Sequence, residues 1–393
     1  MLVVFWGMIT FLKSFEGIRR MGTHPSGPSV IEGGDLDGKT LLEAITENPE
    51  VLGSALGVFG TTLPFLFKVL SIKTALSIQS HPDKSLAEKL HKARPDVYKD
   101  DNHKPEMAIA VSPFEALCGF CEATELKKNL ELVPEIRDCC GEEIVSKYLT
   151  CPSGEEKEAL RSLFTALMTS EEERTAILID KMINRLKQKG TDVNLSPREK
   201  LVLRLNEQYP GDVGILSSWF FNYVQMQTGE AIVLASNEPH AYLSGQIMEC
   251  MATSDNVIRA GLTPKYKDTK VLCDSLTYKQ AFPLVQRGAV SENGKVRVYR
   301  PDFKEFEVWN IQLNQESLVL GSCKGPSILL VHSGEIEMSL GENKALRLKR
   351  GDIFFLPSLF EVKVGTSETT SIWLAAVNGM GFELQTDKEA GSR

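Results

Sequence analysis

The period of the hydrophobic pattern changes twice along this chain, and that change restricts its fold more than any other feature. Residues 21–120 and 211–393 hold short apolar runs with turn-rich borders, and the lengths of these runs favour strands. Residues 122–209 instead repeat apolar residues at helical spacing. At 393 residues the chain is long enough for two or three domains. The sequence therefore predicts strand-rich parts interrupted by an all-α segment.

Serines followed three residues later by glutamate predict helix starts at Ser85, Ser170 and Ser196, the last supported by Pro197 at the first helical position. After residue 211, many short strands without intervening helices are typical of a sandwich or barrel of jelly-roll type. The predicted apolar stripes of the helical segment are Leu160, Leu163, Phe164 and Leu167, followed by Ile177, Ile179, Met182 and Ile183.

Composition and charge exclude several classes of function. The formal net charge is -8 and no basic stripe is present, so a nucleic-acid partner is not expected. The apolar run 2–12 is too short to span a membrane and lacks the basic start of a signal peptide. The eight cysteines follow no disulfide framework and are typical of reduced cytosolic thiols, so we expect a cytoplasmic protein. Cys118 and Cys121 form a CxxC that we interpret as two partly buried thiols.

The chain holds only six histidines, and three lie in short polar segments at 77–82, 102–107 and 237–242. Side chains two apart on a strand share a face, which places Gln79 beside His81, and Glu106 on the face opposite to His103. Because Pro105 cannot donate to a ladder, the second segment is expected at a strand end. His240 follows a proline in extended backbone.

These segments can bring together two imidazole nitrogens, a carboxylate and an amide oxygen. Such a set without thiolate suits zinc or another first-row divalent ion. A single histidine is more often structural, and glutamine is an uncommon ligand. We interpret His24, His91 and His332 as structural residues.

A second group of charges lies between residues 249 and 265, with two carboxylates and two cations: Glu249, Asp255, Arg259 and Lys265. Such a mixture usually forms a solvated face. The apolar and small residues around it indicate instead that the segment is partly buried, where charges need partners or ligands. From the residues alone, both interpretations remain open.

Six runs of this chain resemble, in the same order, the signature runs of the type I mannose-6-phosphate isomerase family. The resemblance is close over residues 21–267 and looser in the tail. The runs are MGTHP (21–25), LPFLFKVL (63–70), QSHP (79–82), NHKPEM (102–107), PHAYL (239–243) and SDNVIRAGLTPK (254–265).

The resemblance implies a mainly β fold of two cupin, or jelly-roll, domains with an all-α insertion. Its implied division is an atypical segment 1–20, a catalytic cupin domain 21–121 with 211–265, an insertion 122–210 and a cupin-like domain 266–393. The family also implies a monomer with one zinc ion per chain that acts on a small sugar phosphate. The implied zinc ligands are Gln79, His81, Glu106 and His240, and the implied substrate residues are Lys68, Ser77, Lys104, Glu249 and Lys265.

The resemblance further implies interconversion of mannose 6-phosphate and fructose 6-phosphate through an enediol, a step that supplies mannose for GDP-mannose and glycans. Such a reaction needs a base and a group that stabilises an oxyanion. Arg259 and Asp255 are expected beside the reacting carbons, and Lys104 near the metal. The base remains open among Lys104, Asp255 and a water on the metal.

Two other functions remain open. One is a cupin metal oxygenase, in which His81, Glu106 and His240 would form an iron site. The other is a catalytically impaired binding protein, because residues 1–20 lack the opening aromatic runs and one acidic pocket residue of the family. The run 2–12 either pairs as a substitute strand or leaves the first domain exposed and marginal. We expect the second.

Overall fold

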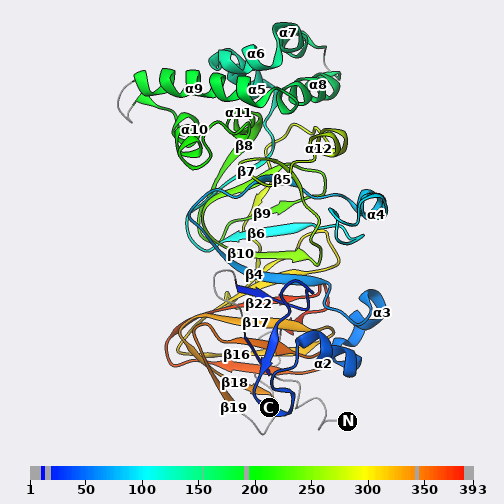
Figure 1. Cartoon of the computed structure of the whole chain (residues 1–393). Helices are drawn as coiled ribbons and strands as arrows, with labels where there is room; N and C mark the ends of the chain where they lie inside the picture. The colour runs from blue at the N-terminus through cyan, green and yellow to red at the C-terminus, as the bar shows by residue number, and fades with distance from the viewer. Residues whose placement is uncertain (1–9, 14–18, 153, 190–193, 341–344, 385–393) are drawn as a thin grey trace.

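The computed structural model describes residues 10–13, 19–152, 154–189, 194–340 and 345–384, arranged as an elongated molecule (Figure 1). Helices occupy one end, a strand-rich region lies in the middle, and the strands of the carboxyl-terminal half form the other end. No helix among these described residues combines the length and apolar character that crossing a membrane requires. The predicted order of strand-rich and helical segments is confirmed.

The helical end consists of amphipathic helices whose apolar faces pack on one core. Ser196 caps α10 together with Glu199 in the predicted capping box, with Pro197 at its first position. The helices are α5 (Ala123–Leu132), α6 (Pro134–Cys140), α7 (Glu142–Thr150), α8 (Glu156–Met168), α9 (Glu172–Gln188), α10 (Pro197–Gln208) and α11 (Gly214–Ser217). The stripe from Leu160 to Leu167 is buried as predicted.

Three details of the predicted helices are wrong. Asp83, not Ser85, caps α4 (Lys84–Ala93) by accepting from the backbone N–H of Leu86. Ser170 does not cap α9, because its hydroxyl donates to the carbonyl of Leu167. Ile177 is 64% exposed, whereas the rest of its predicted stripe is buried. The stripe is therefore narrower than the sequence indicated.

The middle region, here called the middle sheet, is organised around one long strand, β10 (His240–Ala252). At Gly245 the backbone has a φ of 108°, and a Cβ there would lie 2.4 Å from the Pro113 carbonyl oxygen, so only glycine fits. Residues before this point pair with β5 and β7, and those after it pair with β4 and β6. One strand thus supplies side chains to two parts of the site.

The other strands of the middle sheet are short. They are β2 (Arg19–Met21), β4 (Phe65–Ile72), β5 (Ile78–Ser80), β6 (Glu106–Ala110), β7 (Phe114–Phe120), β8 (Phe221–Met226), β9 (Ala231–Leu234), β11 (Ile258–Gly261) and β12 (Val285–Gln286). The prediction that Pro105 marks a strand end is confirmed, since β6 begins directly after it.

The strands from β13 to β23, here called the tail region, form two sheets packed on an apolar core. Gly334 and Gly351 lie in turns, as predicted. One sheet contains β13 (Ala289–Val290), β14 (Val296–Tyr299), β15 (Glu307–Asn314), β17 (Ser327–Ser333), β20 (Ile353–Leu356) and β22 (Thr369–Ala376), together with β1 and β3. The other contains β16 (Ser317–Cys323), β18 (Glu335–Leu340), β19 (Ala345–Lys349), β21 (Val362–Gly365) and β23 (Phe382–Leu384).

Part of the amino-terminal segment forms a strand in the sheet of the tail region. β1 (Thr10–Lys13) pairs with β20 and with β3 (Val30–Glu32), so these residues do act as a substitute strand, in the tail region's sheet. Residues 10–12 of the predicted run are therefore paired, but not in the middle sheet, so the expected exposure of the first domain stays a prediction. The rest of the run, residues 2–9, lies outside the described residues.

A shared apolar core joins the middle sheet to the tail region. It contains Phe65 and Met248 from the first and Ile328 and Phe355 from the second.

Unpredicted helical turns between residues 34 and 59 pack on this core. The short apolar runs of these residues did not distinguish such turns from strands. They are η1 (Gly34–Leu36), α2 (Leu41–Glu47), η2 (Pro49–Ala55) and α3 (Leu56–Phe59), with η4 (Ser218–Phe220) and α12 (Thr269–Ser275) elsewhere. Helix and strand thus hold similar shares of the described chain, and "mainly β" underestimates the helix.

Candidate metal centre and its cationic surroundings

Neighbouring strands of the middle sheet bring the predicted ligand residues together. His240 begins β10 and lies opposite Gln79 of β5 in the antiparallel register, so their side chains lie on the same side of the sheet. His81 follows the end of β5, and Glu106 begins β6 opposite Met251 of β10. The predicted single strand through residues 77–81 is shorter than expected, since β5 covers only Ile78–Ser80.

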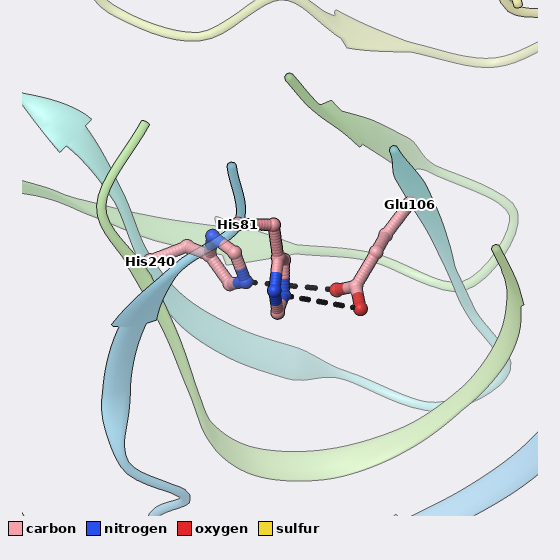
Figure 2. Close-up of side chains that lie close together, drawn as sticks. All are labelled: His81, Glu106 and His240. Carbon is pink, nitrogen blue, oxygen red and sulfur yellow. Dashed lines mark ion pairs between the residues drawn. The ribbon is translucent and has the colours of Figure 1, made fainter. Parts of the chain in front are cut away.

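Two histidines and one glutamate point toward one another in a buried cluster (Figure 2). His81 Nε2 lies 3.3 Å from Glu106 Oε1, and His240 Nε2 lies 3.5 Å from Glu106 Oε2. The centres of the two imidazole rings are 5.0 Å apart. Each of the three residues is 1% exposed. Among the described residues this is the one group of His, Cys, Asp and Glu side chains close enough to share an ion.

The outer nitrogens of both rings fix which atom faces the cluster. His81 Nδ1 lies 2.7 Å from the Asn256 carbonyl oxygen, and His240 Nδ1 lies 3.2 Å from that of Glu238. A carbonyl only accepts, so Nδ1 carries the proton, and Nε2 of the neutral ring presents a lone pair. Within the described chain neither Nε2 has a hydrogen-bond partner. Three electron-pair donors therefore face one another, an arrangement that a cation between them satisfies.

The electrostatics favour the protonation states that a metal requires. Burial, with help from the nearby Lys104 cation, lowers the pKa of His81 to about 4. Burial alone would raise the pKa of Glu106, but the Lys104 cation 3.2 Å away holds it well below its usual value. At neutral pH His81 is therefore neutral and Glu106 is ionised, as ligation requires.

Gln79 and Ser77 lie at the edge of this cluster. The Ser77 hydroxyl donates to Gln79 Oε1 over 3.3 Å, and both side chains are partly exposed. The register with His240 gives Gln79 the side of the sheet that a fourth ligand would need. This amide oxygen is the predicted partner of two imidazole nitrogens and one carboxylate.

Lysines and acids of adjacent strands border the cluster. Lys104 Nζ lies 3.2 Å from Glu106 Oε1, and Lys68 Nζ lies 2.5 Å from Glu249 Oε2. Tyr242 connects these pairs, since its hydroxyl donates to Glu106 Oε2 over 3.4 Å. Burial and the two carboxylates, Glu249 and Glu106, raise the pKa of Tyr242 well above its usual value, so it remains a donor. The predicted substrate lysines Lys68 and Lys104 thus lie in one network with Glu106.

The 255–265 segment holds the remaining predicted residues. Arg259 pairs in register with Gln79, and burial lowers the pKa of its guanidinium. In the described part of the chain, neither Arg259 nor the exposed Lys265 has an acid within ion-pair distance. Asp255 is 43% exposed and lies 3.5 Å from His24 Nε2. The segment therefore presents two cations that are available to an anion.

The other histidines and the CxxC lie outside the cluster, as predicted. His91 Nδ1 is held at 2.8 Å by the Tyr98 carbonyl oxygen, and His103 Nε2 lies 2.6 Å from Glu305 Oε1. Burial raises the pKa of the Cys118 thiol to about 12 and that of Cys121 to about 12. All eight cysteines are free thiols.

Sequence patterns did not single out Tyr242, Glu238 and Asn256, which touch the ligands. Two of them act through a backbone carbonyl, which any residue type supplies. A usable signal existed only for Tyr242, which lies two residues after His240 and therefore on the same side of β10.

The fold and the site define a class of protein, one with a buried group of nitrogen and oxygen donors able to hold a metal ion, in a β-sheet bordered by lysines and an arginine. Residues 17–123 match the catalytic domain of type I phosphomannose isomerase, and residues 140–221 match its helical insertion domain. The chain belongs to the type I phosphomannose isomerase family, a family of enzymes.

Individual relatives support this membership. Mannose-6-phosphate isomerase 1 of Arabidopsis thaliana is 46% identical over 364 residues, which cover 91% of this chain and 84% of that protein. The Bos taurus mannose-6-phosphate isomerase is 39% identical, covering 90% and 85%. A solved zinc-bound mannose 6-phosphate isomerase has 28% identity and a TM-score of 0.78, covering 92% and 91%. A variant of the Salmonella typhimurium phosphomannose isomerase has 26% identity and a TM-score of 0.82, covering 95% and 100%.

Proposed function

We propose that this protein is a zinc-dependent aldose–ketose isomerase that interconverts mannose 6-phosphate and fructose 6-phosphate. The observation that carries the proposal is the buried cluster in which the two Nε2 atoms and the Glu106 carboxylate face one another without a donor between them. The family of the chain supports the substrate, and it argues against the oxygenase alternative.

The residues present fit one zinc ion per chain. His81, Glu106 and His240 would hold it, and Gln79 would complete the set from its position opposite His240. When bound, zinc supplies Lewis acidity for an oxyanion that develops on the substrate. Nitrogen and oxygen donors without thiolate match its preferences.

Cations around the cluster would bind the phosphate and the developing charge. Lys265 is exposed and without an acid partner in the described chain, which suits a phosphate that arrives from solvent. Arg259 lies closer to the cluster, opposite Gln79, and offers a rigid fork to an enediolate. Lys68, Ser77, Lys104 and Glu249 would line the remainder of the sugar pocket.

The isomerisation moves one proton between C2 and C1, and another between the two oxygens, so no redox cofactor is needed. Lys104, which touches Glu106, is placed to hold or move a proton beside the reacting oxygens. Asp255 lies farther out, on the exposed side of the 255–265 segment, where it would orient the sugar. The enediol charge would rest on Arg259.

We also propose the finer architecture. Residues 21–121 with 211–265 would form a catalytic cupin domain, residues 122–210 an insertion, and residues 266–393 a second cupin-like domain. The protein would act as a cytoplasmic monomer, and its product would enter GDP-mannose synthesis. Support comes from the family and from the strand-rich middle and tail regions on either side of the helices.

The test is a coupled assay on mannose 6-phosphate in deuterated water, with fructose 6-phosphate quantified and analysed for deuterium. We expect turnover, with deuterium at the carbon that receives the proton, because an enediol exchanges with solvent. A product free of deuterium would show that the base passes the proton between the two carbons without exchange with solvent. Stoichiometric zinc without any turnover would instead favour the binding-protein alternative.

A further inference from the structure

The Asp100 carboxylate gathers hydrogen bonds from a segment far away in sequence. Its Oδ1 accepts from the Ser254 hydroxyl over 2.7 Å and from Asn256 Nδ2 over 3.1 Å. Its Oδ2 accepts from the backbone N–H of Asp255 over 2.8 Å, and its own carbonyl accepts from Asn256 Nδ2 over 2.7 Å. One acid therefore fixes three consecutive residues, 254–256.

The fixed segment controls one ring of the metal cluster. The Asn256 carbonyl is the acceptor for His81 Nδ1, and Asn256 is 1% exposed. A rotation of that carbonyl would free the His81 ring to turn and remove Nε2 from Glu106. Groups that orient a metal-bound histidine in this way usually contribute to metal affinity.

Asp100 also holds the loop that leads to the other ligand. Its Oδ1 accepts from the backbone N–H of Asn102 over 2.9 Å, and the Asn102 carbonyl accepts from Asn256 Nδ2 over 3.0 Å. Four residues later the same loop reaches Glu106, the first residue of β6. Asp100 thus joins the segment that supports His81 to the loop that carries Lys104 and Glu106.

From these contacts we infer that Asp100 is a positioning residue of the metal centre, acting on His81 through the Ser254–Asn256 hydrogen bonds. Asp100 is not one of the residues close enough to bind the ion itself. The inference rests on the proposed zinc centre. It predicts that zinc affinity depends on Asp100 even though its carboxylate does not touch the cluster.

The substitution Asp100→Asn tests this with little change of shape. The amide cannot accept on its nitrogen, so at least one donor of the 254–256 segment loses its partner. We expect zinc to dissociate about 10–100-fold more readily, as is typical when an orienting group is removed. The readout is zinc affinity in competition with a chromophoric chelator, well below the melting temperature of the zinc-free protein.

Asp101→Asn is the matched control. It removes the same charge one residue along, but Asp101 is 62% exposed and pairs with the surface residue Lys84 at 3.2 Å. We expect its zinc affinity to stay within about 2-fold of the original, because exposed ion pairs contribute little.

Ser254→Ala is a milder second variant, useful if Asp100→Asn does not fold, and it should weaken zinc binding several-fold. If folded Asp100→Asn, or failing that Ser254→Ala, binds zinc as tightly as the original protein, the inference is overturned, even where the zinc-free protein melts earlier. If the original protein itself binds no zinc, the result contradicts the proposed zinc centre, and with it the inference that depends on that centre. That outcome is distinguishable because Asp101→Asn would then be equally empty.

Discussion

The middle sheet and the tail region are both strand-rich, and both bury a glutamate, but the two glutamates have opposite surroundings. In the tail region Glu307 accepts from Arg300 over 2.6 Å, from Trp309 Nε1 over 3.0 Å and from the Gly379 N–H over 3.2 Å. In the middle sheet Glu106 faces two imidazole nitrogens that are themselves acceptors. Glu307 is surrounded by donors, whereas Glu106, although Lys104 and Tyr242 donate to it, also faces two acceptor nitrogens that have no partner among the described residues.

This difference distinguishes a buried glutamate with a structural role from one whose surroundings suit a bound cation. A fully paired buried acid contributes structure, because its desolvation is compensated within the protein. Two buried imidazole nitrogens that face a carboxylate lack such compensation until a cation binds between them. The following predictions test that distinction, beginning with the largest expected effect.

His240→Ala should remove a ligand of the middle sheet and decrease isomerase activity by at least about 100-fold, with loss of bound zinc. The measurement is the coupled assay together with metal analysis of the same preparation. His332→Ala in β17 of the tail region is the matched control and should retain both zinc and activity. A fully active, zinc-loaded His240→Ala protein would remove the basis for the centre.

Arg259→Ala and Lys265→Ala should separate charge stabilisation from binding. Arg259 lies beside the cluster, so its loss should mainly lower kcat, by about 10²–10³-fold if it acts as an oxyanion donor. Lys265 is exposed, so its loss should mainly raise KM. Steady-state kinetics on mannose 6-phosphate measure both constants. If kcat and KM are unchanged in both variants, the charges of the 255–265 segment form a solvated face and do not contact the substrate.

Glu307→Ala should reduce stability without affecting the metal. Removing this acid leaves the buried Trp309 Nε1 without its partner, at a cost of about 1–3 kcal/mol, while the N–H of the exposed Gly379 can bond to water. Thermal unfolding and zinc analysis measure the two effects. Loss of zinc at an unchanged melting temperature would contradict the assignment of this acid to structure.

Phe11→Pro should have the smallest effect on catalysis, because β1 belongs to the tail region's sheet. Proline removes one backbone donor from a strand paired on both sides, which should cost about 1–3 kcal/mol and lower the melting temperature. Phe11→Ile keeps the donor and serves as the control. An unchanged melting temperature for the proline variant would show that the pairing of β1 does not stabilise the fold.

The members of the buried cluster could be singled out because they lie in short polar segments, and the resemblance to the family's runs, rather than the residues alone, implied that they act as ligands. Ser196 and Pro197 predicted a helix start because a capping box is a local sequence pattern. The pairing of β1 with β20 could not be predicted, since it joins residues at opposite ends of the chain and depends on the shared core. The positioning role of Asp100 could not be predicted from the sequence. Its partners are backbone groups and residues 254–256, which only the fold brings near.

The most direct test of the central claim is metal removal followed by replacement, with activity measured on mannose 6-phosphate. A chelator should abolish isomerisation, and one equivalent of zinc per chain should restore it, because the described chain offers one buried cluster able to hold an ion. Full activity in a preparation shown to be free of metal would contradict this claim.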